Sequence, residues 1–158
     1  MPRLQFGAFL APHHPIGEHP MLQMRNDIKF AAHLDALGYD EFWVGEHHST
    51  GWEVIASPEM FLAGVAEHTH RIRLGTGVVS LPYHHPFNVA QRMVQLDHMS
   101  GGRVIFGTGP GALPSDAYML GIDPMTQRDR QDEAIGVIKR LFAGERVTHE
   151  SDWFTLKD

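Results

Sequence analysis

The stretch from Glu41 to His48 reads EFWVGEHH and joins a short apolar run to a polar cluster. Its first part, Glu41 to Gly45, is rich in aromatic and β-branched residues and is bounded by turn formers, which is typical of a buried strand. Gly38 lies just before it and suits the end of a preceding helix. The stretch therefore predicts a helix, then a buried strand, then a loop that carries ionisable side chains.

Three other stretches have the same character. Short apolar runs bounded by turn formers extend over Leu4 to Ala11, Ile72 to Ser80 and Arg103 to Thr108. Their near-continuous apolar sequence favours parallel strands that are covered on both faces. The four predicted strands begin at residues 4, 41, 72 and 103, so their starts are spaced by 37, 31 and 31 residues. This spacing is close to the roughly 30 residues of a βα unit.

Helical patterns lie between and after these strands. Apolar residues recur at every third or fourth position over residues 21–34, 89–99 and 128–142. The triplet Ser57-Pro58-Glu59 suits the start of a further helix, because Ser can cap, Pro fits the first turn and Glu favours the positive end. Strand and helix thus alternate four times, which predicts a parallel sheet with right-handed crossovers. A flavodoxin-like open sheet and half of an eight-stranded barrel both satisfy this pattern.

The last part of the chain predicts a small hairpin. Residues 147–149 and 153–155 are suited to pair as two short strands across residues 150–152. No linker, low-complexity stretch or run of charge divides the sequence. We therefore expect residues 1–158 to form a single unit.

Composition excludes several classes of protein. The 158 residues include no cysteine, 13 Lys+Arg and 19 Asp+Glu, for a formal net charge of -6. A disulfide scaffold is therefore excluded, and 42% hydrophobic residues exclude a disordered chain. The acidic balance disfavours nucleic acid as a partner, and no apolar run approaches the roughly 20 residues of a membrane span. Because residues 1–6 lack the apolar region of a secretory signal, we expect a cytoplasmic protein.

Three histidine pairs follow the first three predicted strands. They are His13-His14, His47-His48 and His84-His85. The carboxyl ends of parallel strands meet at one edge of a sheet, so these pairs are expected at a common rim. One hypothesis is a metal site that takes one imidazole from each pair. For His13, His14, His84 and His85, packing within loops is the simpler interpretation.

Glycines and one carboxylate add candidate ligand contacts. The run Gly107-Thr108-Gly109-Pro110-Gly111 forms either a tight turn or a loop whose backbone closely approaches a ligand. Gly75 and Gly77 interrupt a predicted strand, which indicates either a ligand near the backbone or close packing of a helix. Glu46 precedes the second histidine pair, where it either orients an imidazole or caps a helix.

Taken together, these segments resemble the luciferase-like flavin monooxygenases. The matching pieces are Gly38 to His48, Arg73 to Pro82, His85-Pro86, Leu96 to Arg103 and Phe106 to Gly109. Within that family, the stretches HHPIGEHP and LPYHHPF look closest to limonene-monooxygenase-like and alkanal-monooxygenase-like members. The resemblance implies an α/β fold of the TIM (β/α)8-barrel family. This chain would form an N-terminal half-barrel of about four βα units.

The resemblance also implies a chemistry. Members of the family use reduced FMN, usually supplied by a separate NAD(P)H-dependent flavin reductase, and O2 to oxygenate a small apolar organic substrate such as a terpene or an aldehyde. Some relatives use a deazaflavin instead.

Site residues follow from the same resemblance. The position of His47 matches a histidine beside the flavin that is thought to assist catalysis, and Glu46 matches the carboxylate next to it. Gly77 and Val78 match a place where a non-proline cis peptide commonly supports the flavin ring. Gly109 and Gly111 match a flavin-proximal loop.

Two other functions stay open at this point, and so does the extent of the protein. The alternatives are a metal-dependent hydrolase built on the histidine rim and a non-catalytic flavin-binding half-barrel. A complete barrel takes about 250 residues, so we expect the chain to be a truncated part of a longer barrel. A half-barrel that dimerises and a shortened, inactive protein would also account for the length. Because an open half-barrel exposes strand edges and a sheet face, a homo-oligomer is expected.

Overall fold

The computed structural model describes residues 3–157, and the chain divides into two compact units. The first, here called the sheet unit, comprises residues 1–79 and 95–108, and the second, the helical unit, comprises residues 80–94 and 109–158. The chain passes between them within β4 (Val79–Ser80), α3 (Pro86–Ser100) and β6 (Thr108–Gly109). A single unit over residues 1–158 stays a prediction, and the first two residues and the last lie outside the described part.

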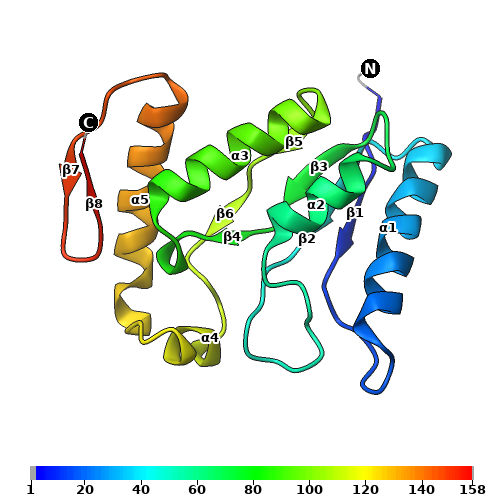
Figure 1. Ribbon diagram of the computed structural model, residues 1–158, viewed down its shortest axis with the longest axis horizontal. Helices are drawn as coiled ribbons and strands as arrows, with labels where there is room; N and C mark the ends of the chain where they lie inside the picture. The colour runs from blue at the N-terminus through cyan, green and yellow to red at the C-terminus, as the bar shows by residue number, and fades with distance from the viewer. Residues whose placement is uncertain (1–2, 158) are drawn as a thin grey trace. The chain divides into compact units, whose positions relative to one another are not determined.

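The sheet unit is built on four parallel strands (Figure 1). Their order in the sheet is β1-β2-β3-β5, so each strand pairs with the one before it in this series. The strands are β1 (Gly7–Leu10), β2 (Glu41–Val44), β3 (Arg73–Thr76) and β5 (Val104–Ile105). In register, Phe9 pairs with Trp43, Trp43 with Gly75, and Gly75 with Ile105. This sequential parallel order confirms the predicted α/β fold and is that of barrel strands.

Helices α1 (Pro20–Leu37) and α2 (Pro58–Ala66) connect the first three strands. Phe42 of β2 is fully buried, and its ring meets that of Phe30 of α1 edge to face at 6.3 Å. Helix α1 ends at Leu37 and is capped by Gly38, whose φ of 86° lies in the left-handed region that favours glycine. Ser57 precedes α2 as predicted, but its side chain makes no capping hydrogen bond.

The two faces of the sheet differ in burial within the described residues. In β2 the side chains alternate between buried and half-buried, and on the same face as the half-buried Trp43, Phe9 of β1 is 60% exposed. The reason is that the helix-facing residues Phe42 and Val44 bury fully, whereas the opposite face carries the aromatic rings. The exposed aromatic face agrees with the sheet face that an open half-barrel is expected to expose, and coverage of both faces stays a prediction.

Two predicted strands are interrupted, and one is shorter than expected. Residues 4–6 are not strand, and the N–H of Phe6 donates to the Asp40 carboxylate and not to a neighbouring strand. The third predicted strand divides into β3 and β4 on either side of Gly77-Val78, and the fourth divides into β5 and β6. The ends of β3 and β5 are thus followed by short irregular segments.

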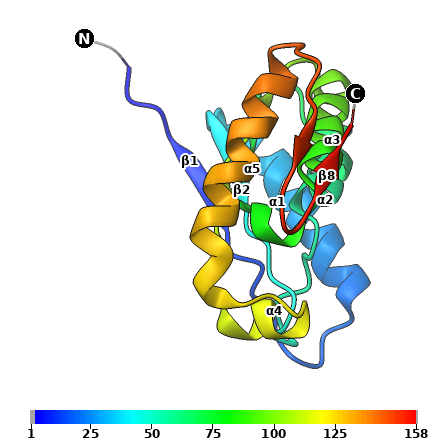
Figure 2. The same ribbon diagram turned by 90° about the vertical axis from the view of Figure 1, so that its left-hand side faces the viewer.

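The helical unit contains a hairpin beside a long helix (Figure 2). The hairpin pairs β7 (His149–Glu150) with β8 (Thr155–Leu156), and it lies along α5 (Gln127–Phe142). Val137, Val147 and Phe154 form its buried apolar core. The predicted hairpin is present, but its strands pair closer to the C-terminus than expected. The other elements are η1 (Leu81–Tyr83), α4 (Pro114–Met119) and η2 (Pro124–Thr126).

None of the helices within residues 3–157 combines the length and the apolar character that a crossing of the bilayer requires.

Candidate functional site

The ends of β1, β2 and β3 converge at one edge of the sheet unit, here called the carboxyl edge. A Cβ on Gly45, just after β2, would lie 3.2 Å from Pro12 after β1 and 3.6 Å from the carbonyl oxygen of Gly77 after β3. The loops after β1 and β2 are also joined, because the N–H of His14 donates to the carbonyl of Trp52 at 2.8 Å. Parallel α/β folds carry their ligands at this edge.

Two of the predicted histidines meet one carboxylate there. Glu53 Oε1 lies 2.9 Å from His13 Nε2 and 3.5 Å from His47 Nε2. The Glu53 side chain is only 5% exposed, whereas that of His47 is 26% exposed. The Thr50 hydroxyl donates to Oε2, the other oxygen of the same carboxylate. A buried carboxylate therefore links the histidine pair after β1 to the pair after β2.

Glu46 makes a separate pair. Its Oε1 lies 2.8 Å from Nε2 of His48, and its side chain is fully buried. Glu46 therefore contacts the imidazole of His48. The imidazole of His47, the residue next to Glu46 in the sequence, lies 3.5 Å from Glu53. Glu46 and His47 were predicted together from the sequence, but Glu53 was missed, because it lies six residues further along in a loop of unremarkable composition.

Gly75 in β3 and Gly77 just after it allow aromatic rings to lie against the sheet. A Cβ on Gly75 would lie closer to Cδ2 and Cε3 of Trp43 than any van der Waals contact, and one on Gly77 would lie 3.1 Å from Cε2 of Phe9. The groups packed against these glycines are rings of neighbouring strands and not a helix, and a ligand near the backbone at Gly77 stays a prediction. Phe9 and Trp43 give this face an apolar surface next to the carboxyl edge.

The peptide between Gly77 and Val78 is cis, at the position that the family resemblance implied. The N–H of Gly77 donates to the carbonyl of Val44 at 2.7 Å, and the N–H of Val79 donates to the carbonyl of Gly107 at 2.9 Å. The segment is thus hydrogen-bonded to β2 on one side and to the segment after β5 on the other.

His14 and His85 have structural contacts. His14 is buried, and its Nε2 lies 2.7 Å from Asp27 of α1. In the helical unit, His85 Nδ1 accepts the N–H of Phe87 at 3.2 Å at the start of α3. Both contacts agree with the interpretation of these residues as loop packing.

The predicted residues Gly109 and Gly111 belong to the helical unit. Gly109 is buried, and Gly111 has a φ of 84°. A Cβ on Gly111 would overlap the Tyr83 side chain and approach Gln127. Gln127 is buried and donates from its amide to the carbonyl of Pro110 at 2.7 Å, so it fixes the loop; no sequence pattern singled it out. A contact of this loop with a flavin stays a prediction.

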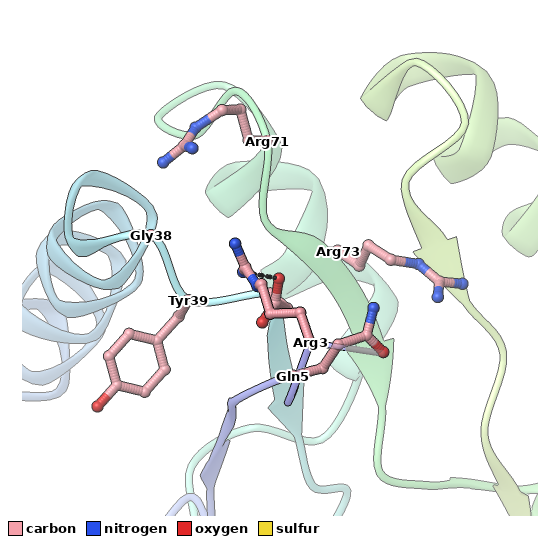
Figure 3. A pocket seen from close by; sticks show the side chains of 7 residues that line it. Arg3, Gln5, Gly38, Tyr39, Arg71 and Arg73 are labelled. Atoms are coloured by element: carbon pink, nitrogen blue, oxygen red, sulfur yellow. Dashed lines mark hydrogen bonds and ion pairs between the residues drawn. The ribbon is translucent and has the colours of Figure 1, made fainter. Parts of the chain in front are cut away.

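A hollow of about 760 Å³ lies at the opposite, amino edge of the same sheet (Figure 3). Two of its three arginines are held by an acidic partner or a carbonyl: Arg3 Nη2 lies 2.6 Å from Asp40 Oδ1, and Arg71 donates to the carbonyl of Asp35 at 2.6 Å. In Figure 3 the guanidinium groups of Arg71 and Arg73 point away from each other. The hollow therefore does not present converging charges to a ligand.

Comparison with known proteins identifies the protein family. The sequence profile of the luciferase-like monooxygenase family matches residues 4–158. The chain therefore belongs to the luciferase-like monooxygenases. The hypothesis of a metal-dependent hydrolase is left without support.

Its individual relatives include oxygenating enzymes. The chain is 59% identical to 4-hydroxyprotoasukamycin monooxygenase of Streptomyces nodosus subsp. asukaensis, covering all of this chain and 43% of that protein. It is 58% identical to limonene 1,2-monooxygenase of Rhodococcus erythropolis, covering 99% of this chain and 40% of that protein. The chain thus spans less than half the length of these relatives.

A solved structure shares the fold closely. The oxygenating constituent of 3,6-diketocamphane monooxygenase from Pseudomonas putida, a type II Baeyer-Villiger monooxygenase solved in complex with FMN, superposes with a TM-score of 0.91. It is 28% identical to this chain, and the match covers 96% of this chain and 43% of that one. The predicted half-barrel therefore has a close structural counterpart.

Proposed function

We propose that the protein is a flavin-dependent monooxygenase that uses reduced FMN and O2 to oxygenate a small apolar organic substrate. Membership of the family supports this proposal, and so do the activities for which its relatives are named. The observation that carries it is the convergence at the carboxyl edge. There, Gly45 and Gly77 approach Phe9, and the following residues bring in Glu46 and His47.

The residues at this edge fit a flat aromatic cofactor. The face formed by Phe9 and the cis Gly77-Val78 peptide is apolar and free of a β-carbon at residue 77, which suits a ring lying flat against the backbone. In the proposed site Gly77, Val78 and Glu46 hold this ring, and Gly109 and Gly111 form a loop near it. When bound, FMN supplies the reaction with O2.

His47 is the proposed proton-handling group. Its imidazole is 26% exposed at the edge and is contacted by the buried Glu53 carboxylate, so it is both accessible and oriented. General acid–base groups of this kind contribute about 10²–10⁴-fold to rate. Phe9 and Trp43 help to exclude water from this part of the site.

The proposed partners are inferred from the same relatives. The structural neighbour is described as an oxygenating constituent, which supports a separate NAD(P)H-dependent flavin reductase as the source of reduced FMN. A homo-oligomer and a cytoplasmic location also belong to the proposal. A terpene or an aldehyde suits the apolar face.

The proposal is tested with the His47→Gln variant of the full-length protein and reduced FMN. Turnover is expected to fall at least about 100-fold, while the dissociation constant of FMN changes less than about threefold, because the ring is held by other residues. His68→Gln is the matched control, since His68 is exposed after α2. Unchanged turnover in His47→Gln would remove His47 from the role.

Flavin titration of the unmodified protein separates the remaining candidates. Binding of FMN with oxygenation supports the proposal. Binding of FMN without oxygenation of any apolar substrate would favour a non-catalytic flavoprotein, and preference for a deazaflavin would replace FMN as the cofactor.

A further inference from the structure

One carboxylate, that of Glu53, lies between two histidines of the carboxyl edge. Its Oε1 lies 2.9 Å from Nε2 of His13 and 3.5 Å from Nε2 of His47. A carboxylate oxygen has two acceptor lone pairs, so one oxygen can accept a hydrogen bond from an N–H of each ring. The side chain is 5% exposed, and a buried carboxylate is costly unless such partners satisfy it.

The loop that carries Glu53 is held in place by its backbone. Residues 13 and 53 form an antiparallel bridge, and the N–H of His47 donates to the carbonyl of Ile55 at 3.3 Å. Thr50 donates its hydroxyl to Oε2. The carboxylate is therefore fixed from the loop after β1, from its own loop and from a neighbouring hydroxyl, so its position does not depend on His47 alone.

A carboxylate that accepts from Nε2 selects one form of the neutral imidazole. The proton then lies on Nε2, and the acceptor lone pair lies on Nδ1. Such partners fix both the orientation of a functional imidazole and the nitrogen that carries its proton. Glu46 pairs with His48 at 2.8 Å, and the Glu53 carboxylate lies 3.5 Å from Nε2 of His47, within the distance of an ion pair.

We propose that Glu53 is a positioning residue that orients the His47 imidazole from its Nε2 side and favours the form protonated on Nε2, while His13 shares the same carboxylate. This inference rests on the proposed function for its catalytic part. Its structural part, the tautomer of His47, is independent of any turnover.

The first test reads the tautomer directly. Nitrogen NMR of ¹⁵N-histidine-labelled full-length protein, with the His47 signals assigned from the His47→Gln variant, is expected to place the proton on Nε2. In Glu53→Gln the charge is lost but the shape is kept, and the His47 signals are expected to move toward a mixture of the two neutral forms. Unmoved His47 signals in Glu53→Gln would overturn the proposal, whatever the protein's activity.

The second test is a double-mutant cycle on turnover with reduced FMN. Glu53→Gln is expected to lower kcat by about 10- to 100-fold, the range seen when an orienting carboxylate is lost, with KM within about threefold. In the His47→Gln background the same change is expected to have less than about a twofold effect, because its target is gone. An equal loss in both backgrounds would overturn the proposal and indicate a structural role.

Two further variants complete the design. Asp27→Asn breaks another carboxylate–imidazole pair, that of His14 at 2.7 Å, and is expected to leave the His47 signals and kcat within twofold. If Glu53→Gln does not fold, Glu53→Asp is used instead. It keeps the negative charge but places the carboxylate one methylene further from His47. It is expected to move the His47 signals and to lower kcat at least threefold, and unmoved signals would again overturn the proposal. If neither the wild type nor any variant shows turnover, the proposed function is wrong. The NMR measurement of the His47 tautomer still decides the role of Glu53 in that case.

Discussion

Gly75 has no room for a side chain, because the indole ring of Trp43 on the neighbouring strand lies over it. The ring is itself held, since Trp43 Nε1 donates to Glu41 at 2.9 Å. We expect Gly75→Ala to lower the free energy of unfolding by about 1–3 kcal/mol, the usual cost of overpacking. Urea denaturation measures the change. Gly136→Ala, on α5 where an added Cβ meets nothing within 4 Å, is the control, and equal losses in the two variants would contradict the steric argument.

At the residue scale, the sequence was a partial guide to the site. The histidine pairs, Glu46 and the glycines were recognisable, because unusual residue types were concentrated after apolar runs. Glu53 was not, because its role arises only when the backbone of its loop pairs with residue 13. The partner of His47 is thus set by loop geometry, which neighbouring sequence does not encode in any local pattern.

At the scale of elements, Asp35 fastens the end of α1 to the segment that enters β3. Its carboxylate accepts the backbone N–H groups of His70, Arg71 and Ile72 at 2.8–3.1 Å. Burial acts to raise the pKa of Asp35, but these hydrogen bonds and the Arg71 charge outweigh it and hold the pKa below its usual value. One side chain therefore satisfies three backbone donors at the entrance to β3.

Replacing this carboxylate has a consequence that depends on pH. A folded-state pKa below the unfolded value means that the contribution of Asp35 to stability is fully present above the unfolded pKa and is lost as pH falls through the folded one. We expect Asp35→Asn to lower the free energy of unfolding at pH 7 by about 1–3 kcal/mol and to flatten its decline in acid. Denaturation at pH 7 and in steps through the acid range measures both effects.

The control for Asp35 is Glu67→Gln, an exposed carboxylate at the end of α2. It is expected to change stability by less than about 0.5 kcal/mol at pH 7. If Asp35→Asn kept the full acid dependence of the unmodified protein, the linkage assigned to this carboxylate would be incorrect.

Most helices and strands were predictable, because their signals are local. The regular spacing of apolar runs indicated the four βα units, and Gly38 marked the end of α1 at a positive φ. Gly75 and Gly77 indicated an irregularity within the third predicted strand, but only the cis peptide implied by the family resemblance pointed to residues 77 and 78, where β3 and β4 are separated. The short helix α4 (Pro114–Met119) was missed, because six residues carry too little periodicity to identify a helix.

At the scale of the whole molecule, the parallel sheet gives its two edges different roles. The carboxyl edge gathers His47, Glu53 and the cis Gly77-Val78 peptide, whereas the amino edge carries a hollow whose arginines do not converge. In barrels built from such strands, the carboxyl edge holds the reacting groups and the amino edge contributes to stability. Strand β3 begins at one edge with Arg73 and is followed at the other by Gly77, so it allows the two edges to be compared directly.

Substitutions at the two ends of β3 are therefore expected to have different effects. Arg73 is 53% exposed and lies 3.9 Å from Glu41, so Arg73→Gln is expected to cost less than about 1 kcal/mol and to leave the FMN dissociation constant and turnover within twofold. Gly77→Ala would bring a Cβ to 3.1 Å from the Phe9 ring, at the proposed flavin surface. It is expected to weaken FMN binding at least tenfold, as measured by fluorescence titration. If Arg73→Gln weakened FMN binding as much as Gly77→Ala, the assignment of ligand binding to the carboxyl edge would fail, because a side chain at the far end of the strand has no means of contacting a ring placed there.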